Sequence, residues 1–182
     1  MDLSKIVVID VEATCWEERA EQQRKGQEII EVGVCLLDAK TGTVNSAESF
    51  LVRPSRLDIS PFCQQLTGIS AEQIEGKGRP LQEVCLQLAE EYRLADRVWA
   101  SFGDFDRNLF EQECAAKRVA YPFSAQHLNI RVLASLKLRS RRRVASIPAA
   151  LQAFGATFEG REHCGRDDAV NAARVLASVL WA

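Results

Sequence analysis

The sequence has few of the residues that build common metal and disulfide sites. It contains two histidines and one methionine, and its six cysteines are scattered without a Cys-x-x-Cys pair. This usage argues against a histidine-rich metal centre, a zinc site and a disulfide framework. Cys35, Cys85 and Cys114 fall in apolar-periodic segments, so we expect them to be small core residues. A reducing compartment fits this cysteine usage.

Long apolar runs and a strong charge of one sign are also missing. No stretch of about 18 apolar residues occurs, and the N-terminus lacks a signal-peptide pattern, so we expect a cytoplasmic protein that does not cross a membrane. The net charge of −2 gives no general attraction to nucleic acid or membrane. A polyanionic partner would therefore need a local basic patch or metal ions. The 182 residues, 47% of them hydrophobic, predict a single domain over 1–182.

Patterns rich in β-branched residues predict a sheet with an antiparallel start. Segments 5–15, 29–38 and 44–52 are typical of three strands in a meander, with Lys40-Thr41-Gly42 as a turn. Further strands are expected at 97–101 and 127–132. Amphipathic spacing and capping residues predict the helices. One is expected at 60–68, and others are expected to begin at 70, at 80 and at about 104. A short helix should end at 138, another should cover 146–155, and the last should run to 180. This order predicts an α/β fold with a mixed sheet flanked by helices.

The charged segment 16–26 has signs of both kinds and follows the first strand. Such a composition is typical of a solvated, mobile loop, and its position makes it a possible lid over a substrate.

Two acids end the first strand. Asp10 and Glu12 are two residues apart, so their side chains project from one face of the strand. A solvated acidic turn is the ordinary interpretation of such a pair. Like charges at the end of a buried strand repel each other unless a cation holds them, which is the alternative.

Further acids and a histidine follow later strands. Asp106 comes just after the strand at 97–101, and His163 precedes Asp168 by five residues at the start of the last helix. Each acid alone is well explained as a helix cap or first-turn acid. Because open α/β sheets place their sites at strand ends and helix starts, the four acids and His163 are expected to converge, which would require divalent metal.

At these residues the sequence resembles the DEDD-type 3′-5′ exonucleases of the histidine-containing (DEDDh, DnaQ-like) subgroup, and most closely their Eri-1-like branch. The shared motifs are Asp10-x-Glu12-Ala13-Thr14-Cys15, Phe105-Asp106, Leu66-Thr67-Gly68-Ile69 and His163-Cys164-Gly165-Arg166-Asp167-Asp168. The resemblance spans residues 5–178 and implies a ribonuclease-H-like fold. It matches Asp106 rather than Asp104, since an aromatic residue precedes it, and Asp168 rather than Asp167.

The resemblance implies a metal-dependent exonuclease that releases nucleoside 5′-monophosphates from the 3′ end of single-stranded RNA. Asp10, Glu12, Asp106 and Asp168 match the metal-binding acids, and His163 matches the general base, for which a histidine's ordinary pKa near 6.5 is suited. Two Mg²⁺ ions, with Mn²⁺ as a substitute, would serve in-line hydrolysis. A DNA-directed exonuclease and a non-catalytic regulatory protein of the same fold are the alternatives.

Substrate contacts are expected in three places, and no protein partner can be inferred. Apolar and aromatic residues after the acids and in the helix at 60–68 suit unpaired bases, and the cationic run 137–143 suits phosphates. Core packing and a solvated loop are the ordinary interpretations of these features. The expected substrate-binding residues are Thr14, Cys15, Trp16, Phe62, Leu66, Ile69, Arg141, Arg142 and Arg143.

Overall fold

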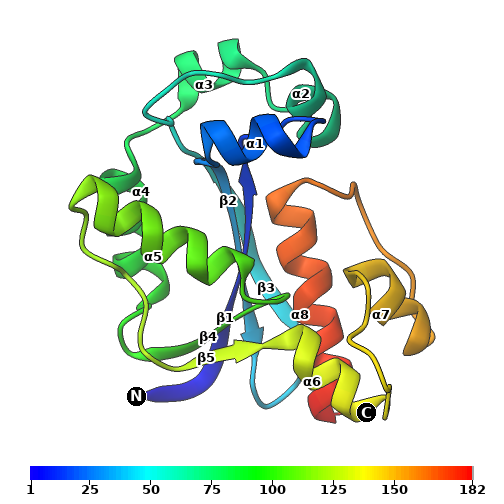
Figure 1. The fold of residues 1–182 in the computed structure, drawn as a ribbon. Coiled ribbons are helices and arrows are strands. Elements are labelled where there is room, and N and C mark those ends of the chain that lie inside the picture. The colour runs from blue at the N-terminus through cyan, green and yellow to red at the C-terminus, as the bar shows by residue number, and fades with distance from the viewer. Residues whose placement is uncertain (182) are drawn as a thin grey trace.

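A five-stranded mixed sheet forms the centre of the computed structural model, which describes residues 1–181 (Figure 1). The strands are β1 (Asp2–Ala13), β2 (Ile29–Asp38), β3 (Val44–Leu51), β4 (Arg97–Ser101) and β5 (His127–Asn129). They lie in the order β3-β2-β1-β4-β5. The β1–β2 and β2–β3 pairs are antiparallel, whereas β4 runs parallel to both β1 and β5. The predicted mixed sheet with an antiparallel meander at its start is confirmed.

Helices flank this sheet in three groups (Figure 1). The helices α4 and α5 lie on one side, α6 to α8 lie on the other, and α1 to α3 lie beyond the end of the sheet where β1 finishes. Their bounds are α1 (Arg19–Lys25), α2 (Pro61–Thr67), α3 (Ala71–Lys77), α4 (Leu81–Tyr92), α5 (Phe105–Lys117), α6 (Ile130–Lys137), α7 (Ile147–Ala153) and α8 (Gly165–Trp181). None of the helices within residues 1–181 has the length and apolar character of a bilayer span.

Strand β1 separates two hydrophobic cores. Val7, Ile9 and Val11 pack in the cluster that includes α4 and α5, while Ile6 and Val8 pack in the cluster that includes α6, α7 and α8. Side chains on a strand alternate between its two faces, so Asp10 and Glu12 continue the row of Ile6 and Val8. Their position in the sequence therefore directs both acids to the α8 side of the sheet.

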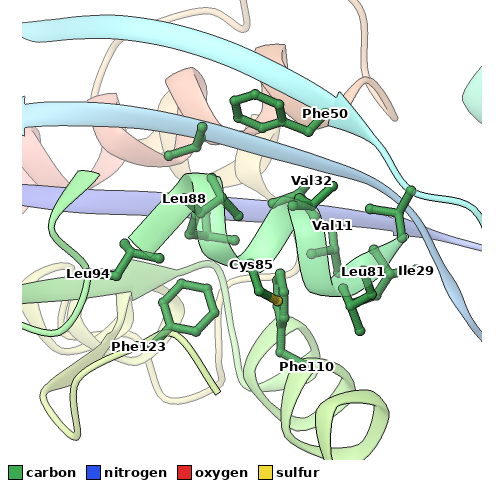
Figure 2. Close-up of a cluster of buried hydrophobic side chains, with 14 of the residues drawn as sticks. Val11, Ile29, Val32, Phe50, Leu81, Cys85, Leu88, Leu94, Phe110 and Phe123 are labelled. Atoms are coloured by element: carbon green, nitrogen blue, oxygen red, sulfur yellow. The ribbon is translucent and has the colours of Figure 1, made fainter. Parts of the chain in front are cut away.

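The core beside α4 shows how a helical pattern meets the sheet (Figure 2). Leu81, Cys85 and Leu88 recur at i, i+4 and i+7 and are all buried, facing Val32 and Phe110 in the same cluster. Burying one large aliphatic side chain contributes about 1.5–3 kcal/mol, so this face fixes α4 firmly. The cysteines predicted to be core residues are indeed buried, namely Cys35, Cys85 and Cys114.

The capping residues predicted several helix ends correctly. The Ser60 hydroxyl accepts a hydrogen bond from the Cys63 N–H at 3.0 Å, and Gly68 closes the same helix in the left-handed conformation with a φ of 72°. Ser70 and Gln73 form the predicted reciprocal capping box at the start of α3.

The prediction of a loop throughout 16–26 is wrong, because α1 occupies Arg19–Lys25. Glutamate, glutamine, alanine and basic residues all have good helix propensity. Glu21 also pairs with Lys25 at 2.9 Å, an i,i+4 contact that supports a helix of mixed charge. Gly26 ends α1 with a φ of 73°. Mixed charge is typical of a solvated loop, and it equally suits a helix on the surface.

The predicted strand at 127–132 is too long. Strand β5 covers only His127–Asn129, and α6 begins at Ile130. The Asn129 side chain accepts a hydrogen bond from the Val132 N–H at 3.1 Å, so it caps the helix. The apolar residues after Asn129 suit a continuing strand as well as a helix. In the structure the Asn129 cap starts a helix, so these residues form the first turn of α6.

Candidate active site

Asp10 and Glu12 lie near the end of β1, opposite Gly33 and Glu31 of β2. Glu12 is buried and Asp10 is half-buried. The pairing of β1 with β2 shifts by a residue just after Glu12. The two carboxylates are thus held on a central strand, where buried neighbours on both sides restrict their movement.

Asp106 reaches the same point from α5. It is buried in the first turn of that helix, and its Oδ1 accepts a hydrogen bond from the Val11 N–H at 3.0 Å. Since Val11 stands between the two acids of β1, this bond brings the third carboxylate to them. The neighbouring Asp104 instead accepts a hydrogen bond from the Asn129 side chain at 2.9 Å. Of these two acids of the α5 start, Asp106 is the one that lines a cleft together with the β1 acids.

Asp168 and His163 come from the start of α8 and the turn before it. The Asp168 Oδ2 accepts a hydrogen bond from the His163 N–H at 2.8 Å, which holds the turn against the helix. His163 adopts a left-handed φ of 59°, and its side chain is exposed. Ligand atoms of Glu12, His163 and Asp168 all lie within 4.8 Å of one another. These three side chains can therefore hold one metal ion.

Two glycines allow α8 to approach the sheet. A Cβ at Gly33 would lie 1.9 Å from the backbone of Gly165, so neither strand nor helix tolerates a side chain at this crossing. The Gly165 N–H also donates a hydrogen bond to Glu31 Oε2 at 2.8 Å. His163 itself has the left-handed backbone, and Gly165 provides the close approach.

The pKa values of the four acids are raised because the carboxylates are buried together. Burial, and then repulsion from Asp106 and Asp168, raises the pKa of Asp10 well above its ordinary range. Burial is also the main cause for the others, raising the pKa of Asp106 to about 6, of Asp168 to about 7 and of Glu12 to about 8. Ionised oxygen ligands in this number suit a hard divalent cation, which would remove the repulsion.

One cleft contains all five predicted catalytic residues. Its volume is about 340 Å³, and its wall includes Asp10, Glu12, Asp106, His163 and Asp168. An apolar side completes the wall, formed by Leu66, Phe102, Phe105, Ile147 and Pro148. Acids and a histidine opposite apolar side chains suit a substrate with a charged group at one end and a flat apolar group at the other.

The family model described as Exonuclease (RNase_T) matches residues 7–176 of this chain. The chain belongs to this exonuclease family. It is 33% identical to human ERI1 exoribonuclease 2 over 92% of its own length and 27% of that protein. The chain thus spans about a quarter of this relative.

Solved structures have the same architecture. The nuclease domain of 3′hExo, a DEDDh family member bound to rAMP, superimposes with a TM-score of 0.87 at 28% identity, covering 96% of this chain and 90% of that one. A 3′-exonuclease complex with the histone mRNA stem-loop gives 0.86 at 28% identity, with 98% of this chain and 64% of that one covered. The ribonuclease-H-like fold is therefore confirmed, and family membership implies dependence on a divalent metal.

Some of the residues predicted to bind substrate line the exonuclease cleft, and others do not. Cys15 and Leu66 line the cleft. Phe62 is 37% exposed on α2 but does not line the cleft. Ile69 is buried in a separate core cluster, so its side chain packs inside the protein.

Thr14 and Trp16 are buried as well. The Thr14 hydroxyl accepts a hydrogen bond from the Glu28 N–H at 2.9 Å, and the Trp16 ring packs beneath the Lys25 ammonium group at 4.9 Å. Both side chains thus hold the segment between β1 and β2. The sequence could not separate them from Cys15, because a motif does not reveal which of its side chains face inward.

The arginine segment, Arg141–Arg143, lies in the connection from α6 to α7. All three arginines are exposed, and no ion pair is found for them within residues 1–181. The connection leads directly to Ser146, Ile147 and Pro148, which line the cleft. The arginine segment is therefore joined by a few residues to the wall of the exonuclease site.

Of the apolar residues on the cleft wall, the sequence predicted Leu66 and missed Phe102, Phe105, Ile147 and Pro148. Phe105 is 48% exposed and lines the cleft. Its place directly before Asp106, at the start of an expected helix, was the signal available in the sequence. Ile147 and Pro148 gave no such signal, since they look like the ordinary first turn of α7.

Proposed function

We propose that this chain is a metal-dependent 3′-5′ exonuclease acting on single-stranded RNA or on the single-stranded tails of RNA, releasing nucleoside 5′-monophosphates. The observation that carries the proposal is the meeting of four carboxylates and a histidine in one cleft. The names of the relatives, an exoribonuclease and a 3′-exonuclease on a histone mRNA stem-loop, support RNA as the substrate. Residues 1–182 would act as one exonuclease domain, for which a cytoplasmic location is predicted.

Two Mg²⁺ ions, replaceable by Mn²⁺, are the proposed cofactors. Asp10, Glu12, Asp106 and Asp168 would hold them, because these acids supply several oxygen ligands and a bound cation would relieve the repulsion among their ionised forms. When bound, such ions increase the acidity of an attacking water and stabilise the oxygen that leaves.

His163 is the proposed general base. Its imidazole is exposed at the cleft and lies beside Glu12 and Asp168, so it can take a proton from a water aligned with the terminal phosphodiester. The backbone bond from its N–H to Asp168 fixes the turn, and with it the direction from which the imidazole approaches. The side chain stays free to move a proton to solvent because it is exposed.

The apolar side of the cleft would hold the terminal nucleoside. Leu66 of α2 and Phe105 of α5 lie on this side, and unpaired bases pack well on such surfaces. The arginine segment would contact phosphates further from the 3′ end. These contacts would orient the last phosphodiester toward the acids without taking part in its cleavage.

The proposal is tested with RNA and DNA oligomers of one sequence, labelled at the 5′ end and incubated with Mg²⁺. We expect ladders that shorten one nucleotide at a time from the 3′ end, faster for RNA, and blocked by a 3′-phosphate. Faster cleavage of DNA would favour the DNA-directed alternative. Absence of cleavage with both Mg²⁺ and Mn²⁺ would favour a non-catalytic protein, and shortening from the 5′ end would contradict the proposal.

A further inference from the structure

A second hollow opens from the catalytic cleft and lies between α1 and α5, which face each other at one end of the sheet in Figure 1. Its volume is about 300 Å³, and it shares Gln27 and Phe105 with the cleft. The two hollows therefore adjoin each other at these residues. A substrate seated in the cleft meets this second hollow as its nearest extension on the α1 side.

The lining of this hollow is unusual in its composition. Side-chain amides dominate it, and no aspartate, glutamate, lysine, arginine or histidine takes part. We name it the amide groove after the side chains of Gln22, Gln23, Gln27, Asn108 and Gln112. An uncharged polar groove gives phosphate little attraction, but it offers donors and acceptors that match the edges of nucleobases.

Two of these amides have a side-chain hydrogen-bond partner, and the other three have none among the described residues. Gln22 accepts from the Trp16 N–H at 3.5 Å and Gln27 donates to the Thr14 carbonyl at 3.3 Å, so both help to hold the segment after β1. For the side chains of Gln23, Asn108 and Gln112, no hydrogen-bond partner occurs among the described residues. Asn108 and Gln112 are one turn apart on α5 and so present their amides side by side.

A third hollow shares Gln27 and Gln112 with the groove, and among the described residues each cation that lines this hollow lies within ion-pair distance of an acid. There, Lys25 pairs with Asp58 at 2.8 Å, and Lys117 pairs with Glu113 at 2.6 Å. Arg56 lies 3.6 Å from Glu28. The unpaired arginines of the arginine segment lead instead to the Ile147 side of the cleft. Charge thus directs the backbone of a bound strand away from the amide groove and leaves the groove to a base.

We propose that the amide groove binds one of the last two bases of the substrate, with Asn108 and Gln112 bonding its edge and Phe105 contacting its face. This assignment rests on the proposed exonuclease function and adds a base-binding site to it. Amides both donate and accept, and each can rotate to exchange the two groups, so different bases can be held. The groove should therefore require a base without strongly selecting which one.

The test combines an abasic substrate with a double variant. RNA oligomers carry an abasic nucleotide at each of the last four positions in turn, and the rate of 3′ release is measured. For wild type we expect a drop of roughly 5- to 30-fold when the base is missing at one of the last two positions, as two neutral hydrogen bonds are lost. Asn108→Ala with Gln112→Ala should lose most of this factor on intact RNA, and removing the base at that position should then cost the variant clearly less than it costs wild type, because only the Phe105 contact is left to lose.

Controls separate the groove from general effects. Gln152→Ala removes an exposed amide of α7 that does not line the groove, and it should change neither rate nor dependence on the base. Melting temperatures of all variants should match wild type, since the substituted side chains are exposed and alanine favours a helix. The assignment would be overturned if removing the base lowers the rate of the double variant by the same factor as it lowers the rate of wild type. The effects of the base and of the two amides would then be independent.

Failure of the proposed function would look different. Binding of the same RNA series to Asp106→Asn protein is measured by fluorescence anisotropy, which requires no turnover. If wild type cleaves nothing but binding still depends on a base through Asn108 and Gln112, the exonuclease proposal is wrong and the groove assignment stands. If wild type cleaves from the 3′ end while the double variant behaves like wild type throughout, only the groove assignment is wrong.

Discussion

The acidic cleft and the arginine segment are neighbours with opposite charge, and the protein builds them in opposite ways. The acids are mostly buried, and backbone N–H groups hold two of them, from Val11 to Asp106 and from His163 to Asp168. The arginines are exposed, and no ion pair holds them within residues 1–181. One site is fixed before a substrate arrives, and the other is left to adapt to one.

This difference predicts that the acidic cleft determines turnover and that the arginine segment determines the affinity for RNA. Reacting groups must be held within a fraction of an ångström, which explains why the acids are placed on a central strand and at helix starts. Contacts to a flexible backbone need only charge of the right sign nearby. Substitutions in the cleft should therefore change turnover, and those in the arginine segment should change binding and its dependence on salt.

The largest effect is expected from Asp106→Asn. Losing one carboxylate removes a ligand from the proposed metal centre, and turnover should fall by at least about 10³-fold, since metal ions supply several kcal/mol to such reactions. The matched control is Asp104→Asn, which alters an acid two residues away that bonds to Asn129 instead. Turnover is measured with saturating RNA and Mg²⁺. Similar losses in both variants would mean that the cleft does not distinguish the two acids as proposed.

His163→Ala should lower turnover by about 10²–10⁴-fold, the range for a positioned acid or base. Mg²⁺ affinity should change little, because the four carboxylates remain. The Mg²⁺ affinity decides between a general base and a metal ligand, because the ligand atoms of His163, Glu12 and Asp168 lie within 4.8 Å of one another. A large loss of Mg²⁺ affinity, measured by calorimetry, would make His163 a metal ligand rather than the base.

The other histidine of the chain is the matched control. His127 packs against Trp99 in a tilted arrangement with ring centroids 4.3 Å apart, and it shares a hydrogen bond with the Ser101 hydroxyl at 2.9 Å. Its replacement by alanine should lower the melting temperature but leave the turnover of the folded protein unchanged. The two variants together separate a catalytic histidine from a structural one.

A smaller effect is expected on stability as pH changes. In the folded protein the pKa of Asp168 is raised to about 7 and that of Glu12 to about 8. The folded state therefore holds more protons than the unfolded state at neutral pH, and the free energy of unfolding falls as pH rises through this range. Without divalent ions we expect the melting temperature to drop by roughly 5–10 °C between pH 6.5 and pH 8.5.

Two other groups act against this fall. Burial lowers the pKa of His127 to about 4, so this residue adds stability mainly as pH rises toward 6.5 and little beyond. A hydrogen bond with Cys15 lowers the pKa of Cys63 to about 7, so the ionisation of this thiol offsets part of the fall inside the window. Mg²⁺ should reduce the fall above pH 6.5 because it offsets the repulsion among the acids. Glu12→Gln should reduce it too. A melting temperature that rises over this window without Mg²⁺ would contradict the raised pKa values.

The sheet and the acidic centre were predictable because short-range patterns determine them. Alternation along β1 directs Asp10 and Glu12 to one face, and cap residues such as Ser60 and Ser70 mark where helices begin. The resemblance to the exonuclease family then selects Asp168, five residues after His163, and in the structure the His163 N–H bonds its carboxylate. Such features depend on a few neighbours in the sequence.

Features that depend on contacts across the fold were not predictable in this way. The crossing of Gly33 with Gly165 joins residues 132 positions apart, and nothing near either glycine reveals the other. The amide groove likewise combines Gln23 of α1 with Asn108 of α5. Even α1 was missed, because its charges suit both a loop and a surface helix. Packing between distant segments decides these cases.

The smallest effect is expected when the arginine segment is neutralised. Replacing Arg141, Arg142 and Arg143 with glutamine should weaken RNA binding and reduce the slope of log affinity against log salt by up to about 2, since each single-strand phosphate contact contributes roughly 0.7. Turnover at saturating RNA should stay close to wild type, because none of the three arginines lines the cleft.

A control for that variant removes the same charge elsewhere. Lys40, Lys77 and Arg118 are exposed on other parts of the surface, and their replacement by glutamine lowers the net charge equally. If attraction arises from overall charge, both triple variants should flatten the salt dependence alike. If the arginine segment contacts phosphates directly, only its own replacement should do so. An unchanged slope in the arginine variant would mean that the segment is a solvated loop, and that the cleft and the amide groove hold the strand without it.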